Sequence, residues 1–335
     1  MSAAARPPLP PVELMRRVAP LDSDRDEAAD YEAAGLRIKE FICSQLPADW
    51  SWDGKRVLDF GCGAGRVLRH FASEAESCEF WGSEIDEPSV RWIERHLSPP
   101  FRAVLHDESP PLRVPDGHFD LTYAMSVFTH IGDEWSAWLL ELHRSLAPRG
   151  LLLATFLGPG MIAPLAGERW SDDRIGINFS SCGAAWDRGG PNTFISPWWL
   201  RAHWGRAFDV LRLEPAAYDS GDPRGLHGFA LLRRKDVTLS REDLEAPEPG
   251  EPRELHSTRH NVRQLARELS SVRRRLDSSL DANRAFAEHL ESTRSHWRET
   301  AEWWEAKTET IIDSPMWRLT KPLRRLRSRL RNRRG

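Results

Sequence analysis

Three closely spaced glycines follow an acidic residue at the end of an apolar run. Gly61, Gly63 and Gly65 come shortly after Asp59, in the run Val-Leu-Asp-Phe-Gly-Cys-Gly-Ala-Gly that begins at residue 57. A glycine turn lets the backbone pass close to a ligand, and the N–H groups that open a following helix can bind anionic or zwitterionic groups. The order of strand, glycine turn and helix is typical of a nucleotide-binding site.

The glycine spacing separates two kinds of nucleotide-binding turn. A dinucleotide-binding turn places its third glycine three residues after the second. Here that position is Arg66, and the third glycine is Gly65. The spacing therefore argues against a nicotinamide dinucleotide and for a shorter turn.

Further polar side chains follow the next three apolar runs. Glu84 and Asp86 come about 20 residues after the glycines, where a carboxylate can accept hydrogen bonds from a ribose diol, and Glu84 is the first choice. Asp107 and Glu108 follow the third run, where an acidic side chain can accept from an adenine amino group. Ser126 follows the fourth run. We expect these side chains to face one crevice outside the strand ends.

The segments between Arg56 and about Lys235 predict an α/β fold. Short apolar runs alternate there with amphipathic stretches, which is the pattern of βαβ units in a mainly parallel sheet. One helix, from about Asp26 to Leu46, precedes the first strand. The seven predicted strands are Arg56–Phe60, Glu79–Glu84, Arg102–His106, Phe119–Ala124, Leu151–Phe156, Phe208–Glu214 and His227–Arg234.

Two regions interrupt this alternation. The loop from Pro215 to Gly225 is rich in Pro, Gly and Asp and leaves no room for a helix, so it predicts an antiparallel closing pair of strands. Residues 158–197 lack strong periodicity, and we expect an irregular inserted loop there.

Four motifs in order resemble those of the class I S-adenosylmethionine-dependent methyltransferases. They are Val57–Gly65, Gly82–Glu84, Pro115–Asp120 and Leu146–Gly150, and the likeness runs from about Arg56 to Arg234. The resemblance implies a Rossmann-like seven-stranded methyltransferase sheet of order 3-2-1-4-5-7-6, with S-adenosyl-L-methionine as the cofactor. It also implies that the glycine turn holds the methionine part, Glu84 the ribose and Asp107 the adenine. The predicted cofactor-binding residues are Asp59, Gly61, Cys62, Gly63, Gly65, Glu84, Asp86, Asp107, Glu108 and Ser126.

Alternatives to these roles follow from the residues themselves. Asp59 either contacts the ligand or stabilises the glycine turn, and Asp107 is alternatively an ordinary loop carboxylate. Cys62 is expected to pack between the glycines rather than to react. The family motifs are also altered at two positions, since Glu84 stands where Asp is commoner and Arg149 where Gly is commoner.

His130 is the predicted catalytic residue. A sulfonium carries an activated methyl group, so a general base is needed chiefly when the acceptor is a hydroxyl. His130 follows the fourth strand and would face the crevice, although a capping or core histidine is an equal alternative. The weaker candidates are Asp172, Asp173, Asp187 and His227.

The cysteines and the N-terminal segment bear on the cellular compartment. The four cysteines form no CxxC pair and no cluster with zinc-ligand spacing, so we expect no metal site and a reducing, cytoplasmic location. No signal peptide and no apolar run of membrane-spanning length are expected.

Beyond the α/β region the sequence predicts a different organisation. An acidic, proline-rich linker is followed by apolar residues at intervals of seven from Leu255 to Ile311, interrupted by Asn283. This pattern predicts a coiled coil that forms a homo-oligomer, or alternatively one amphipathic helix packed on the domain. The expected divisions are a flexible leader over 1–25, the methyltransferase domain over 26–240, a linker over 241–253, the coiled coil over 254–312 and a basic tail over 313–335.

The tail has its own charge. Residues 316–335 hold nine Lys or Arg and no acidic residue, whereas the whole chain carries a net charge of −3. Leu319, Leu323, Leu326 and Leu330 share one helical face, which favours an anionic membrane surface over nucleic acid. Ser314 to Arg324 also resembles the ending of bacterial enzymes of surface-polysaccharide synthesis.

These features lead to three hypotheses for function. The first is an O-methyltransferase acting on a saccharide or lipid-linked glycan, peripheral at the inner face of the cell membrane. The second keeps the methyl transfer but changes the acceptor to a small metabolite or a protein. The third is a cofactor-binding scaffold without catalysis.

Overall fold

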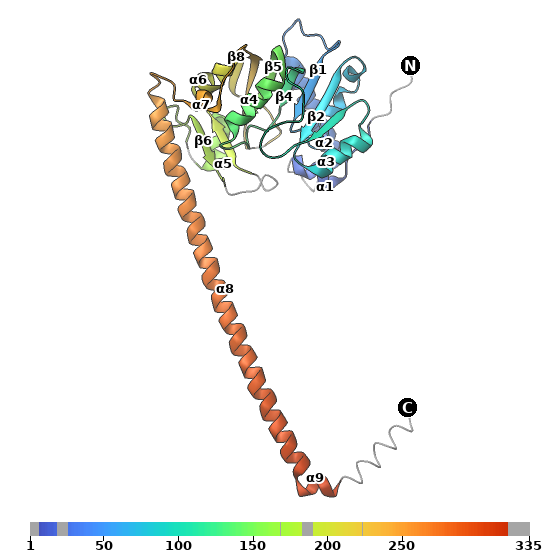
Figure 1. Ribbon diagram of the computed structural model, residues 1–335, viewed down its shortest axis with the longest axis vertical. Helices are drawn as coiled ribbons and strands as arrows, with labels where there is room; N and C mark the ends of the chain where they lie inside the picture. Colours follow the sequence, from blue (N-terminus) through green and yellow to red (C-terminus); the bar gives the residue numbers. More distant parts are fainter. Residues whose placement is uncertain (1–6, 19–25, 168, 183–189, 223, 321–335) are drawn as a thin grey trace. The chain divides into compact units, whose positions relative to one another are not determined.

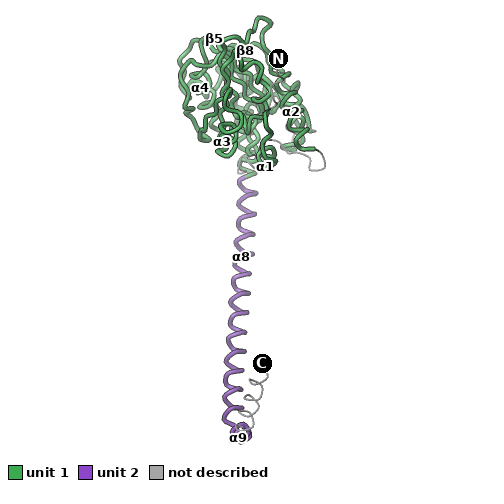
Figure 2. Tube along the Cα trace, turned by 90° about the vertical axis from the view of Figure 1, so that its right-hand side faces the viewer, with its two compact units in different colours: residues 1–268 green, residues 269–335 purple. Residues whose placement is uncertain are grey.

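The chain divides into two compact units, residues 1–268 and residues 269–335, which Figure 2 colours separately. The computed structural model describes residues 7–18, 26–167, 169–182, 190–222 and 224–320.

A seven-stranded sheet lies at the centre of the first unit (Figure 1). Its strands are β1 (Arg56–Phe60), β2 (Glu79–Glu84), β3 (Arg102–Leu105), β4 (Phe119–Ala124), β5 (Leu146–Phe156), β8 (Phe208–Tyr218) and β9 (His227–Arg234). The order across the sheet is β3-β2-β1-β4-β5-β9-β8. Strands β1 to β5 are parallel, and β9 is antiparallel to β5 and β8. With the hairpin strands β6 and β7 set aside, this confirms the predicted fold and the order 3-2-1-4-5-7-6.

Helices pack on both faces of the sheet because the central strands are apolar on both sides. Successive residues of β1 point to opposite faces, so Val57 and Leu58 belong to two different hydrophobic cores. The Val57 core includes residues of α2 (Glu27–Gln45) and α3 (Glu87–His96). The Leu58 core includes residues of α4 (Trp135–Ser145) and α6 (Pro197–Ala207).

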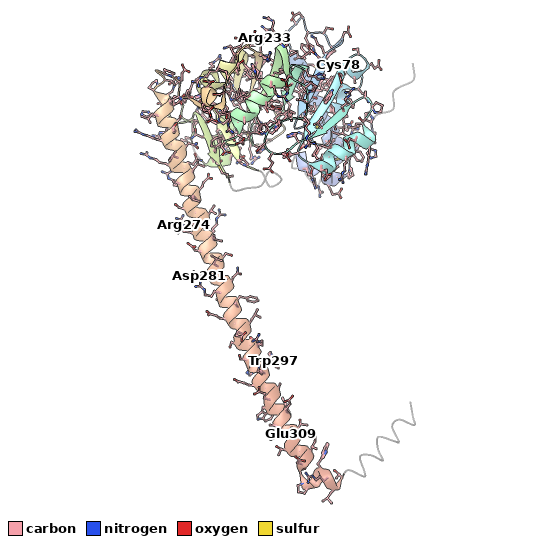
Figure 3. All side chains as sticks on the ribbon, viewed as in Figure 1. Cys78, Arg233, Arg274, Asp281, Trp297 and Glu309 are labelled. Carbon is pink, nitrogen blue, oxygen red and sulfur yellow. The ribbon has the colours of Figure 1, made fainter. Side chains whose placement is uncertain are left out.

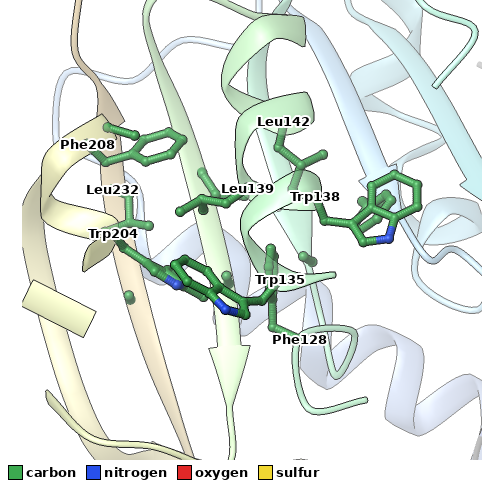
Figure 4. Close-up of a cluster of buried hydrophobic side chains, with 14 of the residues drawn as sticks. Phe128, Trp135, Trp138, Leu139, Leu142, Trp204, Phe208 and Leu232 are labelled. Atoms are coloured by element: carbon green, nitrogen blue, oxygen red, sulfur yellow. The ribbon is translucent and has the colours of Figure 1, made fainter. Parts of the chain in front are cut away.

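Large aromatic side chains dominate the second of these cores (Figure 4). Trp135 and Trp138 extend from α4, and Trp204 extends from α6 with its side chain fully buried. The ring centroids of Trp204 and Phe128 lie 4.7 Å apart. Phe128 belongs to the loop after β4, so this packing fixes the loop that leads into the predicted crevice.

The region predicted as an irregular inserted loop contains regular structure. It forms α5 (Pro159–Ala166) and an antiparallel hairpin of β6 (Ile177–Ser180) with β7 (Asn192–Ile195). The prediction was wrong because these strands have only four residues each, too few to show a clear period. Phe194 is fully buried, so the hairpin is anchored to the domain.

Two segments at the edges of the domain also differ from the prediction. Within the expected flexible leader, α1 (Val12–Val18) forms and buries Leu14 and Met15. Within the expected linker, α7 (Arg241–Glu245) forms behind a Ser240 cap and buries Leu244. Both helices are too short for the sequence pattern to reveal, and burial of their apolar side chains stabilises them.

The α-helix expected directly after the glycine turn is replaced by 3₁₀ structure. The chain there forms two short 3₁₀ segments, η1 (Leu68–Phe71) and η2 (Glu74–Glu76), and no α-helix. The first of them packs Leu68 and Phe71 into the core beside α2.

A single helix, α8 (Arg253–Asp313), begins in the first unit and continues through the second, where α9 (Pro315–Leu319) follows it. In the second unit its apolar side chains are exposed, with Leu269 at 70% and Trp297 at 65%. Figure 3 shows Trp297 projecting from the helix. Among the described residues, no helix is both long and apolar enough to cross a membrane.

The aromatic core gives a test of packing. Trp204→Ala removes a fully buried indole, and we expect it to lower the free energy of unfolding by about 3–5 kcal/mol. Trp303→Ala removes an exposed indole that lies outside the heptad series and is the matched control, with a change within about 0.5 kcal/mol. Denaturant unfolding measures both. Equal losses would contradict the assigned core.

Candidate functional site

The glycine turn leaves the carboxyl end of β1 in the left-handed backbone region. The φ angles are +77° at Gly61, +53° at Gly63 and +80° at Gly65. A Cβ on Gly61 would also lie 2.5 Å from Cγ2 of Val127. The N–H groups of Gly61 and Cys62 both donate to the Ser83 carbonyl, at 2.9 and 3.1 Å. Glycine at position 61 therefore meets a need for both conformation and space.

Glu84 joins the end of β2 to the glycine turn. Its Oε2 accepts from the N–H of Gly63 at 2.8 Å. Its Oε1 accepts from the N–H groups of Ile85 and Asp86, at 2.8 and 3.1 Å. Burial raises the pKa of Glu84, and these three donors oppose that rise by stabilising the carboxylate. A carboxylate offers about four acceptor positions, so about one remains for a ligand.

Asp59 is a second buried carboxylate at this edge of the sheet. Its Oδ2 has no hydrogen-bond partner among the described residues. Burial, with a smaller contribution from the charge of Glu84, raises the pKa of Asp59 to about 8, and the Tyr123 hydroxyl opposes this rise. A buried oxygen without a partner costs free energy, and a ligand that donates a hydrogen bond would remove that cost.

Asp86 connects the turn to α1 and α3. Its Oδ2 caps α3 by accepting from the N–H and the hydroxyl of Ser89, at 3.0 and 2.5 Å. Its Oδ1 pairs with the guanidinium of Arg17, on α1. The carboxylate predicted as a reserve ribose acceptor is thus engaged by protein groups.

A cavity of about 1030 Å³ opens beside the glycine turn. Most of the predicted site residues line it, and they come from the ends of β1, β2 and β4 and from the loop after β3. Those residues are Asp59, Gly61, Cys62, Gly63, Glu84, Asp86, Glu108, Ser126 and His130.

Two predicted cofactor residues, Gly65 and Asp107, are absent from the cavity wall. A Cβ on Gly65 would lie 2.6 Å from Cδ1 of Leu97, so this glycine allows the turn to pack against the end of α3. Asp107 is exposed, and its carbonyl lies 2.8 Å from Nδ1 of His106. Of the two acidic residues predicted to accept from an adenine amino group, only Glu108 lines the cavity, so Glu108 is the better candidate.

Cys62 lines the cavity and packs beneath the turn. Its Sγ would lie 2.6 Å from a Cβ at Gly82, so the thiol occupies the space that a side chain on β2 would need. Burial raises the pKa of the thiol well above its usual value, which disfavours the reactive thiolate.

His130 lies at the cavity wall with one ring nitrogen engaged. Its Nδ1 lies 3.0 Å from the carbonyl of Pro191, just before β7. A hydrogen on Nδ1 donates to that carbonyl and leaves Nε2 with a free lone pair. His130 is exposed at the cavity mouth, but neighbouring protein atoms partly desolvate the ring and lower its pKa, which favours the neutral imidazole.

Three of the weaker candidates for the base, His227, Asp172 and Asp173, do not line this cavity. His227 is buried, its Nε2 lies 3.3 Å from the Ser220 hydroxyl, and burial lowers its pKa to about 4. Asp172 and Asp173 are exposed. Asp187 lies outside the described residues.

Several cavity residues were not found from the sequence. Arg17 comes from α1, Phe179 and Cys182 come from the inserted region, and Asn261 and Leu265 come from the first turns of α8. They are distant in sequence from the glycine turn, and only tertiary folding brings them to it. No local motif marks them.

Residues 32–181 match the family model described as a methyltransferase domain. This segment is therefore similar to a methyltransferase domain. Its match includes the glycine turn, Glu84 and His130. The match ends in the inserted region, before the last two strands of the sheet.

The chain is also similar to three methyltransferases. A 27-O-demethylrifamycin SV methyltransferase of Amycolatopsis mediterranei is 31% identical over 140 residues, 39% of this chain and 48% of the relative. A phthiotriol/phenolphthiotriol dimycocerosates methyltransferase of Mycobacterium ulcerans is 23% identical, over 45% of this chain and 50% of the relative. A fatty-acid O-methyltransferase of Mycolicibacterium smegmatis is 25% identical, over 32% and 39%. The matched methyltransferase domain spans half or less of each relative.

Two solved structures are similar to the chain at low identity. A Burkholderia thailandensis 1,6-didemethyltoxoflavin-N1-methyltransferase has 18% identity and a TM-score of 0.44, covering 70% of this chain and 98% of that one. The PH0226 protein from Pyrococcus horikoshii has 15% identity and a TM-score of 0.45, covering 66% and 98%. Similarity at this level assigns no function.

The raised pKa of Asp59 predicts a pH-dependent stability. The folded state, with a pKa of about 8, holds the proton more tightly than the unfolded chain, so the wild type loses stability as the pH rises from about 4 to about 8. Asp59→Asn does not titrate, so its Tm should rise relative to the wild type across this interval. The exposed Asp49→Asn is the control and should follow the wild type. Parallel curves for all three proteins would refute the assigned pKa.

Proposed function

We propose that the chain is an S-adenosylmethionine-dependent O-methyltransferase. The observation that carries the proposal is the meeting of Asp59, the glycine turn and Glu84 at one cavity, inside a segment that matches a methyltransferase domain. Ligand pockets in proteins are about 300–1,000 Å³. A cavity of about 1030 Å³ has room for a nucleoside cofactor and part of an acceptor.

The residues present fit this cofactor. Asp59 offers a buried oxygen without a partner, and Glu84 retains about one acceptor position for a donor such as a ribose hydroxyl. Gly61 lacks the side chain that would fill the turn. When bound, S-adenosylmethionine supplies a methyl group activated by its sulfonium.

His130 is the proposed general base. Its Nε2 lone pair accepts the proton of an acceptor hydroxyl as the oxygen attacks, and its Nδ1–H stays bonded to Pro191. The lowered pKa keeps the ring able to accept a proton at neutral pH. The β6–β7 hairpin thereby positions the base, because Pro191 precedes β7.

The first candidate acceptor is a saccharide or a lipid-linked glycan in bacterial surface-polysaccharide synthesis. Its support is the Ser314 to Arg324 segment, which resembles the ending of enzymes of that synthesis. Met316 and Leu319 are 79% and 78% exposed, which suits a contact with a membrane surface. The remaining tail leucines, Leu323, Leu326 and Leu330, lie outside the described residues. On this proposal the enzyme is cytoplasmic and peripheral at the inner membrane face.

The second candidate acceptor is a small metabolite or a lipid. The names of the three similar methyltransferases denote a rifamycin derivative, a phthiotriol lipid and a fatty acid. Aromatic side chains such as Phe179 and Trp138 line the cavity and can pack on an apolar acceptor as well as on a sugar ring.

The exposed seam of α8 supports a homo-oligomer. Leu269, Leu276 and Leu290 recur on the heptad spacing and are 70%, 57% and 52% exposed in the single chain. A coiled coil with a second copy would bury them. Asn283 stands in the same series, where a polar residue can fix register and oligomer order.

Cofactor binding tests the proposal against a scaffold that lacks the cofactor. S-adenosylmethionine at 100 times its Kd should stabilise the folded wild type by about 2.7 kcal/mol, visible as a rise in Tm. Glu84→Gln should weaken binding at least tenfold by titration calorimetry, whereas Glu40→Gln, on an exposed site, should not. Absence of any shift at saturating cofactor would instead support the scaffold.

The base assignment has a separate test. Surface glycans from a strain lacking this chain should miss a methyl group by mass analysis, and those glycans then serve as the acceptor. His130→Ala should lower turnover by about 10² to 10⁴-fold while the cofactor Kd changes little. Equal losses of turnover and cofactor affinity would refute the role of His130. Fully methylated glycans in the deletion strain would refute the glycan acceptor and favour a small metabolite or lipid.

A further inference from the structure

A second concave site, a basic groove, lies apart from the cofactor cavity. It has a volume of about 740 Å³ and lies between residues 169–175 and the first turns of α8. Among the described residues, its wall includes five arginines, two histidines and one acidic residue, Asp173. The arginines are Arg169, Arg174, Arg259, Arg263 and Arg267.

Helical spacing gathers three of these arginines on one face of α8. Arg259, Arg263 and Arg267 are four residues apart, which places them in one row. Another face of α8, which carries Asn261 and Glu268, is hydrogen-bonded to the inserted hairpin. Asn261 Oδ1 accepts from the N–H of Phe179 at 3.0 Å, and Glu268 accepts from the N–H of Ser181. These bonds hold the helix in place and leave the arginine row toward the groove.

The arginines of the groove have no acidic partner among the described residues. In the described parts of the chain, the five guanidinium groups form no ion pair and no side-chain hydrogen bond. Like charges four residues apart on a helix destabilise it. Elsewhere on the same helix arginines pair with acids, as Arg284 does with Asp281 and Arg294 with Glu291. An anion from outside the chain would remove the repulsion in the groove.

We propose that this groove binds a diphosphate group. A guanidinium presents a fork of N–H donors that matches phosphate oxygens, which explains five arginines and no lysine in the wall. Arg259 and Arg267 are about 12 Å apart along the helix axis, a span longer than one phosphate. The five arginines and one acid of the described lining also suit an anion with more than one phosphate. Among the described lining residues, the wall holds no Phe, Tyr or Trp on which a nucleic-acid base could stack.

The site is independent of methyl transfer. The basic groove and the cofactor cavity lie on different faces of the same helical segment, because Asn261 and Leu265 line the cavity. A diphosphate held there belongs either to a lipid carrier or to a soluble molecule. Both present the same chemistry to the arginines.

Calorimetric titration of the full chain with sodium pyrophosphate tests the proposal. Binding should exceed that of sulfate at equal ionic strength and should weaken as salt is added. The double variant Arg259→Gln/Arg263→Gln should weaken binding at least tenfold, and glutamine keeps the helix propensity. The control, Arg273→Gln/Arg275→Gln, makes the same charge change on α8 in the second unit and should bind as the wild type does. Unchanged affinity in the groove variant, or equal losses in both variants, would overturn the proposal.

A vesicle arm distinguishes the sources of the diphosphate. Phosphatidylcholine vesicles that carry a polyprenyl diphosphate are compared with a free nucleoside diphosphate, and the tail is present in every protein. Loss of vesicle binding in the groove variant alone supports a lipid-linked diphosphate. Loss of nucleoside diphosphate binding alone supports a soluble one. If the groove variant binds both ligands as tightly as the wild type does, the groove is not a diphosphate site.

Discussion

The carboxylate of Glu84 holds the candidate site together. One oxygen binds the N–H of Gly63 and the other binds the N–H groups that follow β2, so a single side chain joins two strand ends. The parallel register of β1 with β2 sets this distance, since Phe60 lies opposite Ser83. Without that bond a buried Gly63 donor would lack a partner, and the left-handed turn would lose its support. The shape of the cavity depends on this turn, because Asp59 lies just before it and Val127 packs against Gly61.

Much of the fold could be predicted because its determinants are local. Each central strand is a short apolar run between turn residues. The glycine turn needs left-handed backbone conformations, which glycine adopts without strain. The seven strands of the central sheet, and most of the site residues at their carboxyl ends, follow from that pattern. Asp107 shows its limit, because the loop after β3 turns this side chain outward and leaves Glu108 at the cavity.

What could not be predicted depends on contacts across the chain. α1 is one short helix in a proline-rich segment, and burial of Leu14 and Met15 stabilises it. Arg17, on α1, lines the cavity and pairs there with Asp86. Asn261 belongs to a helix whose heptad pattern predicts association, whereas its first turns close a cavity wall and a basic groove. The spacing of apolar residues in a sequence indicates which face of a helix is apolar, but it does not indicate what that face contacts.

The close packing of Cys62 against Gly82 has an evolutionary consequence. The thiol fills the space beside β2, so a methyl group at position 82 would lie 2.6 Å from its sulfur. An alanine at 82 is compatible only with a smaller residue at 62, which is itself framed by two glycines of the turn. Positions 62 and 82 should therefore vary together among homologous chains. A lineage that enlarges one must first shrink the other, which restricts the order in which substitutions here can accumulate.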